Sequence, residues 1–519
     1  MALTTEQEQK ITELLAAFEN GKRISDLSDA QGAVGDMQIE VMDESGETRK
    51  MMLGEAVETA SNPIAGRYWN EANSTPTAAG YYGSLQALRD LPKKLGLGRY
   101  LVTDDRKRRK LDPVDSTKFE DGSPAALDGS MGQCMWCWNA HYFTTWKEGN
   151  NTILAVTFAP IAGKPSIYVP AGGISWMDAA VMDRTNTKLC SVISDAEQYR
   201  GGNGTALTAG NYSKAPAADA PQLTMLGMPA TSISTTNFGA YARKRGEGWE
   251  ANWFVALAVV EYLFEIIMGT RNSQAAFNGE LDENGLYQGG FGTGVTNMPD
   301  WGNYNGTYPV IPTSVGLEAG DGVCLVDYSL PATAPAEGSE EEQAESYHTF
   351  QVPVFFGLVN AGFGSLWRWV RGLTISQTAG EKMEVYVAPS MYADFTPDTV
   401  EGKVKVCDCP LTQSYIKKKS YNGLCCMPTE VGGSASTYFC DYFYNNAASA
   451  TGFRVRAAGG NANNGTIAGA STRVRTTRLR LRIRTTRRPS AFSRKTRKSN
   501  KTKTGRSPNE NNRSLKFCA

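Results

Sequence analysis

The stretch that decides the fold is FFGLVNAGFGSLWRWVRGLTI, residues Phe355–Ile375. Turn-forming Gly and Asn residues fill its first half, and a Trp-x-Trp pair followed by branched aliphatic residues fills its second half. The second half predicts a strand in the core of a domain. We expect Trp367 and Trp369 to point to opposite faces of that strand, with at least one of them buried.

The sequence around this stretch, from about residue 111 to residue 470, contains many short apolar segments separated by Gly, Asn and Pro. Segments such as TILAVTFAPI and EKMEVYVAP predict strands. One strong helix is predicted over residues 251–268, and its Glu261 and Glu265 would be costly at the centre of a bilayer. We therefore expect a buried helix rather than a membrane span, in an α+β domain with long loops.

The N-terminal part of the chain has two predicted regions. Residues 1–25 are expected to form a short helix for attachment or oligomerisation, because the apolar residues of ITELLAAF recur at helical spacing. Residues 26–110 have a mixed pattern and are expected to form a connector or a small domain. The first residues are polar, so no secretory signal is expected.

The charge of the chain is unevenly distributed. Lys and Arg number 53, as do Asp and Glu, yet residues 473–519 hold 17 basic residues and one acid, Glu510. Residues 1–472 therefore hold 36 basic and 52 acidic residues, a net charge of −16. Residues 471–519 are expected to be a disordered basic tail. Such a tail suggests nucleic-acid binding, because clustered cations release the counterions of phosphates.

Three segments carry a resemblance to a known family. Phe355–Ile375 resembles the core signature of phage and bacterial proteins with a C-type lectin fold, and EYLFEIIMGTRNSQ, residues Glu261–Gln274, resembles the helix and turn before it. Gly423–Ala470 resembles the end of variable proteins that a diversity-generating retroelement alters. The resemblance covers about residues 111–470 and implies a C-type lectin-like ligand-binding domain. It departs from the family at Arg371, where an acid is usual.

In this family the changes fall at template adenines, so Asn codons are favoured targets. The resemblance implies a ligand-binding set made of Tyr442, Tyr444, Asn445, Asn446, Asn461, Asn463 and Asn464. We expect these residues to lie together on one exposed face, with Phe443 or Phe453 packed inward. Composition alone favours a plain Asn/Gly turn cluster instead. A scattered or buried arrangement of the asparagines would argue against receptor binding through this face and in favour of function through the basic tail.

The basic tail has a second interpretation in its possible codons. If the reading frame is shifted back by one nucleotide, codons that encode Arg475–Arg478 can also encode an Ala-Asn-Asn-Ala run. That run is similar to the in-frame Asn461–Asn464 segment. The same shift turns Arg488–Lys495 into an apolar, strand-like segment. We therefore hypothesise that a frameshift between about residues 470 and 475 replaced the last loop and the closing strand of the domain.

Candidate catalytic chemistry is sparse. Cys134 and Cys137 form a CxxC motif interleaved with Trp and Met, which favours core packing over zinc binding. The CDC at residues 407–409 and the CC at residues 425–426 are typical of small apolar fillers, with copper or redox chemistry as the alternative. No catalytic residue, metal site or cofactor is predicted.

The sequence thus predicts a phage tail or tail-fibre receptor-binding protein (an adhesin) and not an enzyme. Its expected partners are a bacterial surface protein or glycan and other phage tail proteins, in a virion and as a homo-oligomer, possibly a trimer. One alternative is an enzyme of the formylglycine-generating type, which needs a reactive Cys pair in a cleft. The other, less favoured, is nucleic-acid binding through the tail.

Overall fold

The computed structural model describes residues 38–42, 48–52, 62–331, 347–473 and 517–518, with gaps at 78–79, 179, 195, 200–228, 231–232, 294, 296–310, 362–363, 392–394 and 463. The helix expected at residues 1–25 lies outside the described residues, as does most of the tail expected at 471–519. The described part is rich in antiparallel strands and contains the α-helices α3 (Leu85–Lys94), α4 (Thr235–Arg243) and α5 (Phe254–Met268). This confirms an α+β fold at the level of class.

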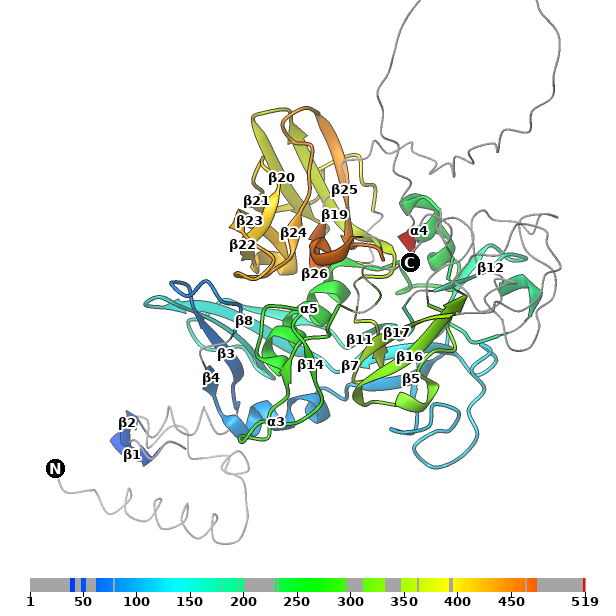
Figure 1. Cartoon of the computed structure of the whole chain (residues 1–519), viewed down its shortest axis with the longest axis horizontal. Coiled ribbons are helices and arrows are strands. Elements are labelled where there is room, and N and C mark those ends of the chain that lie inside the picture. Colours follow the sequence, from blue (N-terminus) through cyan, green and yellow to red (C-terminus); the bar gives the residue numbers. More distant parts are fainter. Residues whose placement is uncertain are drawn as a thin grey trace, which may run out of the picture.

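Two antiparallel sheets form the first half of the described chain (Figure 1). The five-stranded sheet has the order β10-β8-β9-β3-β4, with β3 (Ala65–Asn70), β4 (Gly80–Gly83), β8 (His141–Glu148), β9 (Asn151–Thr157) and β10 (Ser166–Val169). The four-stranded sheet has the order β11-β7-β5-β6, with β5 (Gly98–Val102), β6 (Arg108–Lys110), β7 (Gln133–Trp138) and β11 (Gly172–Ser175). The sequence placed a domain boundary at residue 110. In the structure β3 pairs with β9 and β5 pairs with β7, so both sheets contain strands from before and after this boundary, and the fold continues across it.

The second half contains three further sheets. The largest has the order β21-β20-β19-β25-β26, with β27 parallel to β19; its strands are β19 (Trp367–Thr378), β20 (Lys382–Val387), β21 (Val404–Asp408), β25 (Gly452–Gly459), β26 (Gly469–Arg473) and β27 (Phe517–Cys518). A three-stranded sheet has the order β23-β22-β24, with β22 (Ser414–Ser420), β23 (Met427–Gly433) and β24 (Tyr442–Phe443). Another has the order β16-β17-β18, with β16 (Val323–Pro331), β17 (Tyr347–Phe355) and β18 (Leu358–Val359).

Small elements complete the described structure. The two-stranded pairs are β1 (Gln38–Met42) with β2 (Thr48–Met52), β12 (Val181–Asp183) with β13 (Lys188–Cys190), and β14 (Phe277–Asn278) with β15 (Gln288–Gly289). The 3-10 turns are η2 (Glu197–Tyr199), η4 (Leu317–Ala319), η5 (Asn422–Leu424) and η6 (Gly465–Ile467).

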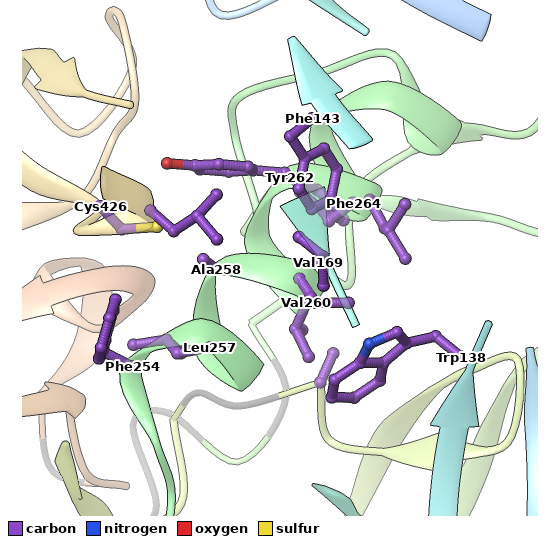
Figure 2. Close-up of a cluster of buried hydrophobic side chains, with 14 of the residues drawn as sticks. Trp138, Phe143, Val169, Phe254, Leu257, Ala258, Val260, Tyr262, Phe264 and Cys426 are labelled. Carbon is purple, nitrogen blue, oxygen red and sulfur yellow. The ribbon is translucent and has the colours of Figure 1, made fainter. Parts of the chain in front are cut away.

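Helix α5 is the centre of the core. It contacts β3, β9 and β11 on one side and β19 and η5 on the other (Figure 1). Its sequence is apolar on nearly every side, which is typical of a helix surrounded by protein. Figure 2 shows Phe143 and Tyr262 together in this core, and their ring centroids are 5.0 Å apart with the rings nearly perpendicular. The helix ends at Gly269, whose φ of 66° is the left-handed conformation that favours glycine at a helix end.

The two carboxylates of α5 join a buried ionic cluster. Lys419 of β22 lies 2.8 Å from Glu265 Oε1 and 3.3 Å from Glu261 Oε2. Arg456 of β25 lies 3.3 Å from Glu261 Oε1, and the Tyr421 hydroxyl donates to Glu265 Oε2 at 2.8 Å. These side chains are buried, so the cluster fixes both C-terminal sheets to the helix by charge as well as by packing.

None of the helices in the described residues is both long and apolar enough to cross a bilayer. The predicted helix at residues 251–268 is observed as α5, which has 15 residues. Glu261 and Glu265 are each 2% exposed and lie in the ionic cluster described above. The interpretation of this apolar segment as a buried helix is therefore confirmed.

The expected split of the Trp-x-Trp pair is wrong. Trp367 is 1% exposed and Trp369 is 6% exposed, and both belong to the same buried cluster between β19 and α4. Residues two positions apart in a strand share a face, so the pair points the same way. The part of the prediction that required at least one buried Trp is confirmed.

Arg371, which departs from the family pattern, is also buried. Its Nε donates to Glu250 Oε1 at 2.9 Å, and its Nη1 donates to the Thr235 carbonyl at 2.9 Å. The guanidinium thus links β19 to α4 and has a structural role in this chain.

Candidate functional site

The side chains of the predicted ligand-binding residues near β24 (Tyr442–Phe443) alternate between more exposed and buried positions. Tyr442 and Asn446 are half-buried and Tyr444 is 39% exposed, whereas Phe443 and Asn445 are buried. The alternation is that of an extended chain from Tyr442 to Tyr444, and Asn446 follows at the start of a turn. Phe443 is 0% exposed, which confirms the inward packing expected of Phe443 or Phe453.

A third tyrosine, half-buried like Tyr442, lies next to it. Tyr415 of β22 lies opposite Tyr442 of β24, and the two rings meet edge to face with centroids 5.1 Å apart. We call Tyr415, Tyr442 and Tyr444 the tyrosine surface. Rigid aromatic rings with polar tips provide large contact areas at low entropic cost, which suits a binding surface.

Asn445 does not belong to this surface. It is 6% exposed, and its Nδ2 donates weakly to the carbonyls of Pro410 and Thr412 at 3.4 and 3.3 Å. Its Oδ1 accepts from the Ala447 amide at 2.9 Å. The expectation that Asn445 is exposed is therefore wrong, because its amide satisfies backbone groups inside the turn.

The second group of predicted asparagines lies at the other end of β25. Asn461 is 3% exposed; its amide donates to Asn464 Oδ1 at 2.9 Å, and the Asn464 amide donates to the Asn461 carbonyl at 2.9 Å. Asn463 lies outside the described residues. This turn follows Gly459, the last residue of β25. Asn446 lies near the first residue of β25, Gly452, because it bonds to Gln377, which pairs with Gly452. At about 3.3 Å per residue, the two ends of β25 are roughly 23 Å apart.

The expectation of one exposed face that contains all these asparagines is therefore wrong. Asn461 and Asn464 form the plain Asn/Gly turn that composition alone favours, and Asn445 is a buried structural residue. Tyr442, Tyr444 and Asn446 remain together as candidates for ligand binding. Sequence reasoning missed Tyr415, because only the pairing of β22 with β24 brings it next to Tyr442.

Replacing Asn445 by alanine should lower the free energy of unfolding by about 1–3 kcal/mol, because it leaves buried backbone groups without their partner. Asn446→Ala is the matched control and should cost less than 1 kcal/mol, since its Oδ1 makes only a 3.4 Å contact with Gln377. Urea denaturation of both variants measures the difference. Equal losses would contradict the structural role of Asn445.

A polar cleft of about 830 Å³ lies beside β12, β13 and α4. Its charges are largely matched within the protein: Asp104 accepts from Arg245 Nη1 at 2.7 Å and from Lys188 Nζ at 2.9 Å. Partial burial alone would raise the pKa of Asp104, but these hydrogen bonds outweigh it and lower that pKa. The side chains that line the cleft include Asp128, Ser130, Met131, Gln133, Asp183, Asn186, Tyr199 and Lys244.

The cysteines of the described residues provide no activated thiol at this cleft. Cys190 lines it, but burial raises the pKa of its thiol. Cys134 and Cys137 are 0% and 1% exposed, and burial raises the pKa of Cys137 to about 12. Core packing of the CxxC motif is thus confirmed. Within the described ranges, no group of three or more His, Cys, Asp or Glu side chains is arranged to hold a metal ion.

Two comparisons with known proteins found no match for this chain. No protein-family model matches it, and no curated protein matches it either. The tyrosine surface and the polar cleft are therefore interpreted from their own geometry.

Proposed function

We propose that this protein is a phage tail-associated receptor-binding protein that binds a bacterial surface protein or glycan through its tyrosine surface. The exposure of Tyr444 beside the edge-to-face pair of Tyr415 and Tyr442 carries the proposal. The scaffold is proposed to be C-type lectin-like, on the resemblance of Phe355–Ile375 and Gly423–Ala470. The same resemblance supports the assignment to a phage virion.

The local structure supports the use of this surface for binding. Phe443 anchors the strand in the core, so Tyr442 and Tyr444 are presented from a fixed backbone. Asn445 fixes the following turn to the segment at residues 410–412. Side chains presented by a rigid backbone lose little entropy when a ligand binds. Repetition of a weak surface in an oligomer would add avidity, as expected of a tail protein.

Replacing Tyr442 and Tyr444 together by serine should weaken binding to bacterial cells at least tenfold, because the loss of one central aromatic residue often costs about 2 kcal/mol. Labelled protein is titrated onto a panel of bacterial strains, and bound fluorescence is measured by flow cytometry. The matched control is Tyr168→Ser, which changes a tyrosine that is 55% exposed on β10 of the five-stranded sheet.

The control should bind like the unchanged protein. Both variants should stay folded at the assay temperature, and the Tyr442/Tyr444 variant should have a slightly lower denaturation midpoint, because it loses the aromatic contact with Tyr415. Equal binding by the Tyr442/Tyr444 variant would exclude the tyrosine surface as the receptor site. Loss of binding by the Tyr168 variant alone would place the receptor site on the five-stranded sheet.

The burial of Asn445 and Asn461 favours a second candidate, nucleic-acid binding through residues 473–519 with their 17 basic residues. Such binding should weaken steeply with salt, because each neutralised phosphate releases a counterion. Fluorescence anisotropy with a labelled DNA duplex, at several salt concentrations, measures this slope. Deletion of residues 473–519 should abolish DNA binding if this candidate is right, and should leave cell binding unchanged if the tyrosine surface is the receptor site.

A further inference from the structure

The two cysteine motifs of the C-terminal half meet in space. Cys407 lies on β21 and Cys425 follows η5, and their sulfur atoms are 3.7 Å apart. All nine cysteines with described side chains are free thiols, and Cys407 is partly exposed whereas Cys425 is buried. Cys425 belongs to the main buried core and Cys407 packs against it, whereas the tyrosine surface includes neither cysteine.

We propose that Cys407 and Cys425 form an oxidation site, at which a disulfide oxidant such as oxidised glutathione joins them covalently. The site does not depend on the proposed receptor binding, because the chemistry needs only the two thiols and their separation. A sulfur–sulfur bond is about 2.05 Å long, so the sulfurs have to approach by less than 2 Å.

The surroundings hold the two thiols in place. The turn at η5 is fixed to β21, since Asn422 Nδ2 donates to the Val406 carbonyl at 3.0 Å. Gly423 packs so closely on Val406 that a Cβ atom there would lie 2.5 Å from Val406 Cγ1. The Cys425 thiol also contacts the Ser420 carbonyl at 3.6 Å. These contacts hold the turn that leads to Cys425 against β21, which carries Cys407.

The reaction balances as two exchange steps. The hydrogen bond with Cys409 and burial raise the pKa of the Cys407 thiol, so only a small fraction of it is ionised at pH 8. The thiolate of Cys407 attacks one sulfur of oxidised glutathione, which forms a mixed disulfide and releases one glutathione thiolate. The thiolate of Cys425 then attacks the Cys407 sulfur and releases the second glutathione. The protein loses two hydrogen atoms, and one glutathione disulfide is reduced to two glutathione thiols.

The bond would close a loop that contains the whole of β22. This strand carries Tyr415 of the tyrosine surface and Lys419 of the ionic cluster. For a loop of this length, a disulfide is expected to raise the ratio of folded to unfolded protein by about a hundredfold. Oxidation would therefore hold β22 in place after the protein leaves a reducing compartment.

The test uses the full chain, freshly reduced and kept folded, and then incubated with oxidised glutathione at pH 8. Remaining thiols are blocked with N-ethylmaleimide, and peptide mass spectrometry maps the linkage. We expect one cross-linked peptide pair that joins Cys407 to Cys425, with a higher urea midpoint than that of the reduced protein. A stable glutathione adduct on Cys407, a bond from Cys407 to Cys409, or no bond would each overturn the proposal.

Two variants sharpen the test. Cys409→Ala changes a buried thiol two positions away and should keep both the linkage and the rise in urea midpoint. Cys407→Ser should lose both. The linkage map of the unchanged protein decides the proposal even if a variant fails to fold. A rise in midpoint that persists in Cys407→Ser would show that another bond is responsible and would overturn the assignment.

Discussion

Replacing Lys419 by methionine should lower the free energy of unfolding by about 3–5 kcal/mol, because removal of one partner leaves buried charge without compensation. Lys419 is 2% exposed at its side chain and lies between Glu261 and Glu265. Burial alone would lower the pKa of Lys419, but the charges of Glu265 and Glu261 outweigh it and raise that pKa. Methionine is an unbranched side chain one heavy atom shorter than lysine, and it removes both the charge and the donors to Glu261 and Glu265.

The chain offers a matched control one residue away. Lys418 on the same strand is 46% exposed at its side chain and pairs with Glu430, so Lys418→Met should cost less than about 1 kcal/mol. Urea denaturation measures both variants. Adding Glu265→Gln to Lys419→Met should cost less than the sum of the single changes, because it removes one uncompensated carboxylate. Similar losses for the Lys418 and Lys419 variants would show that the cluster does not hold the C-terminal sheets.

The second large effect is a loss of stability on acidification that depends on His141. This side chain is 0% exposed, its ring packs edge to face on Phe143, and its Nδ1 lies 2.8 Å from the Asn139 carbonyl. A carbonyl oxygen can only accept a hydrogen bond, so Nδ1 carries the hydrogen in the neutral ring and donates it to this carbonyl. Nε2 is buried and has no hydrogen-bond partner among the described residues. Protonation of Nε2 would therefore place an unpaired charge in the core.

Burial accordingly lowers the pKa of His141 from 6.5 to about 4. Between these values the unfolded chain binds the proton and the folded chain does not, so the free energy of unfolding falls as the pH falls from about 6.5 to about 4. From pH 7.5 to pH 4.5 the contribution of this group is roughly 2.5 kcal/mol. His141→Asn keeps a donor near the Asn139 carbonyl and cannot titrate.

Urea denaturation at both pH values measures the effect. The His141 variant should lose roughly 2.5 kcal/mol less than the unchanged protein between pH 7.5 and pH 4.5. His348→Asn, which changes the other histidine of the sequence, controls for the substitution itself and should keep the original pH dependence. If both variants have the same pH dependence as the unchanged protein, another group is responsible for the acid sensitivity.

Much of the secondary structure followed from local pattern. The apolar run at residues 251–268 predicted α5, which ends where expected and begins three residues later, at Phe254. A continuous apolar segment ended by a glycine allows few other structures. The strand around Trp367 was also expected, and β19 contains it. The side of the strand on which each residue lies was predicted less well. Trp367 and Trp369 were assigned to opposite sides of β19, although residues two positions apart in a strand share one side.

The candidate site was predicted only in part. Phe443 packs inward and Tyr444 is exposed, as expected, whereas Tyr442 is half-buried rather than exposed. The alternation at these three residues is a local property of the chain. Asn445 and Asn461 are buried instead of exposed. An asparagine in a turn can either bond to the nearby backbone or face solvent, and the sequence of the turn does not distinguish these two arrangements. The position of Tyr415 next to Tyr442 depends on which strands pair.

By itself, the sequence determined the class of fold, the central helix, the burial of the CxxC thiols and the uneven distribution of charge. These features depend on periodicity, apolar content and composition, which act over short stretches of chain. The tertiary structure alone decided that Lys419 meets Glu261 and Glu265, that Cys407 meets Cys425, and that the two asparagine groups lie at opposite ends of β25. Each of these depends on contacts between residues far apart in the chain, and strand pairing and packing around α5 select those contacts.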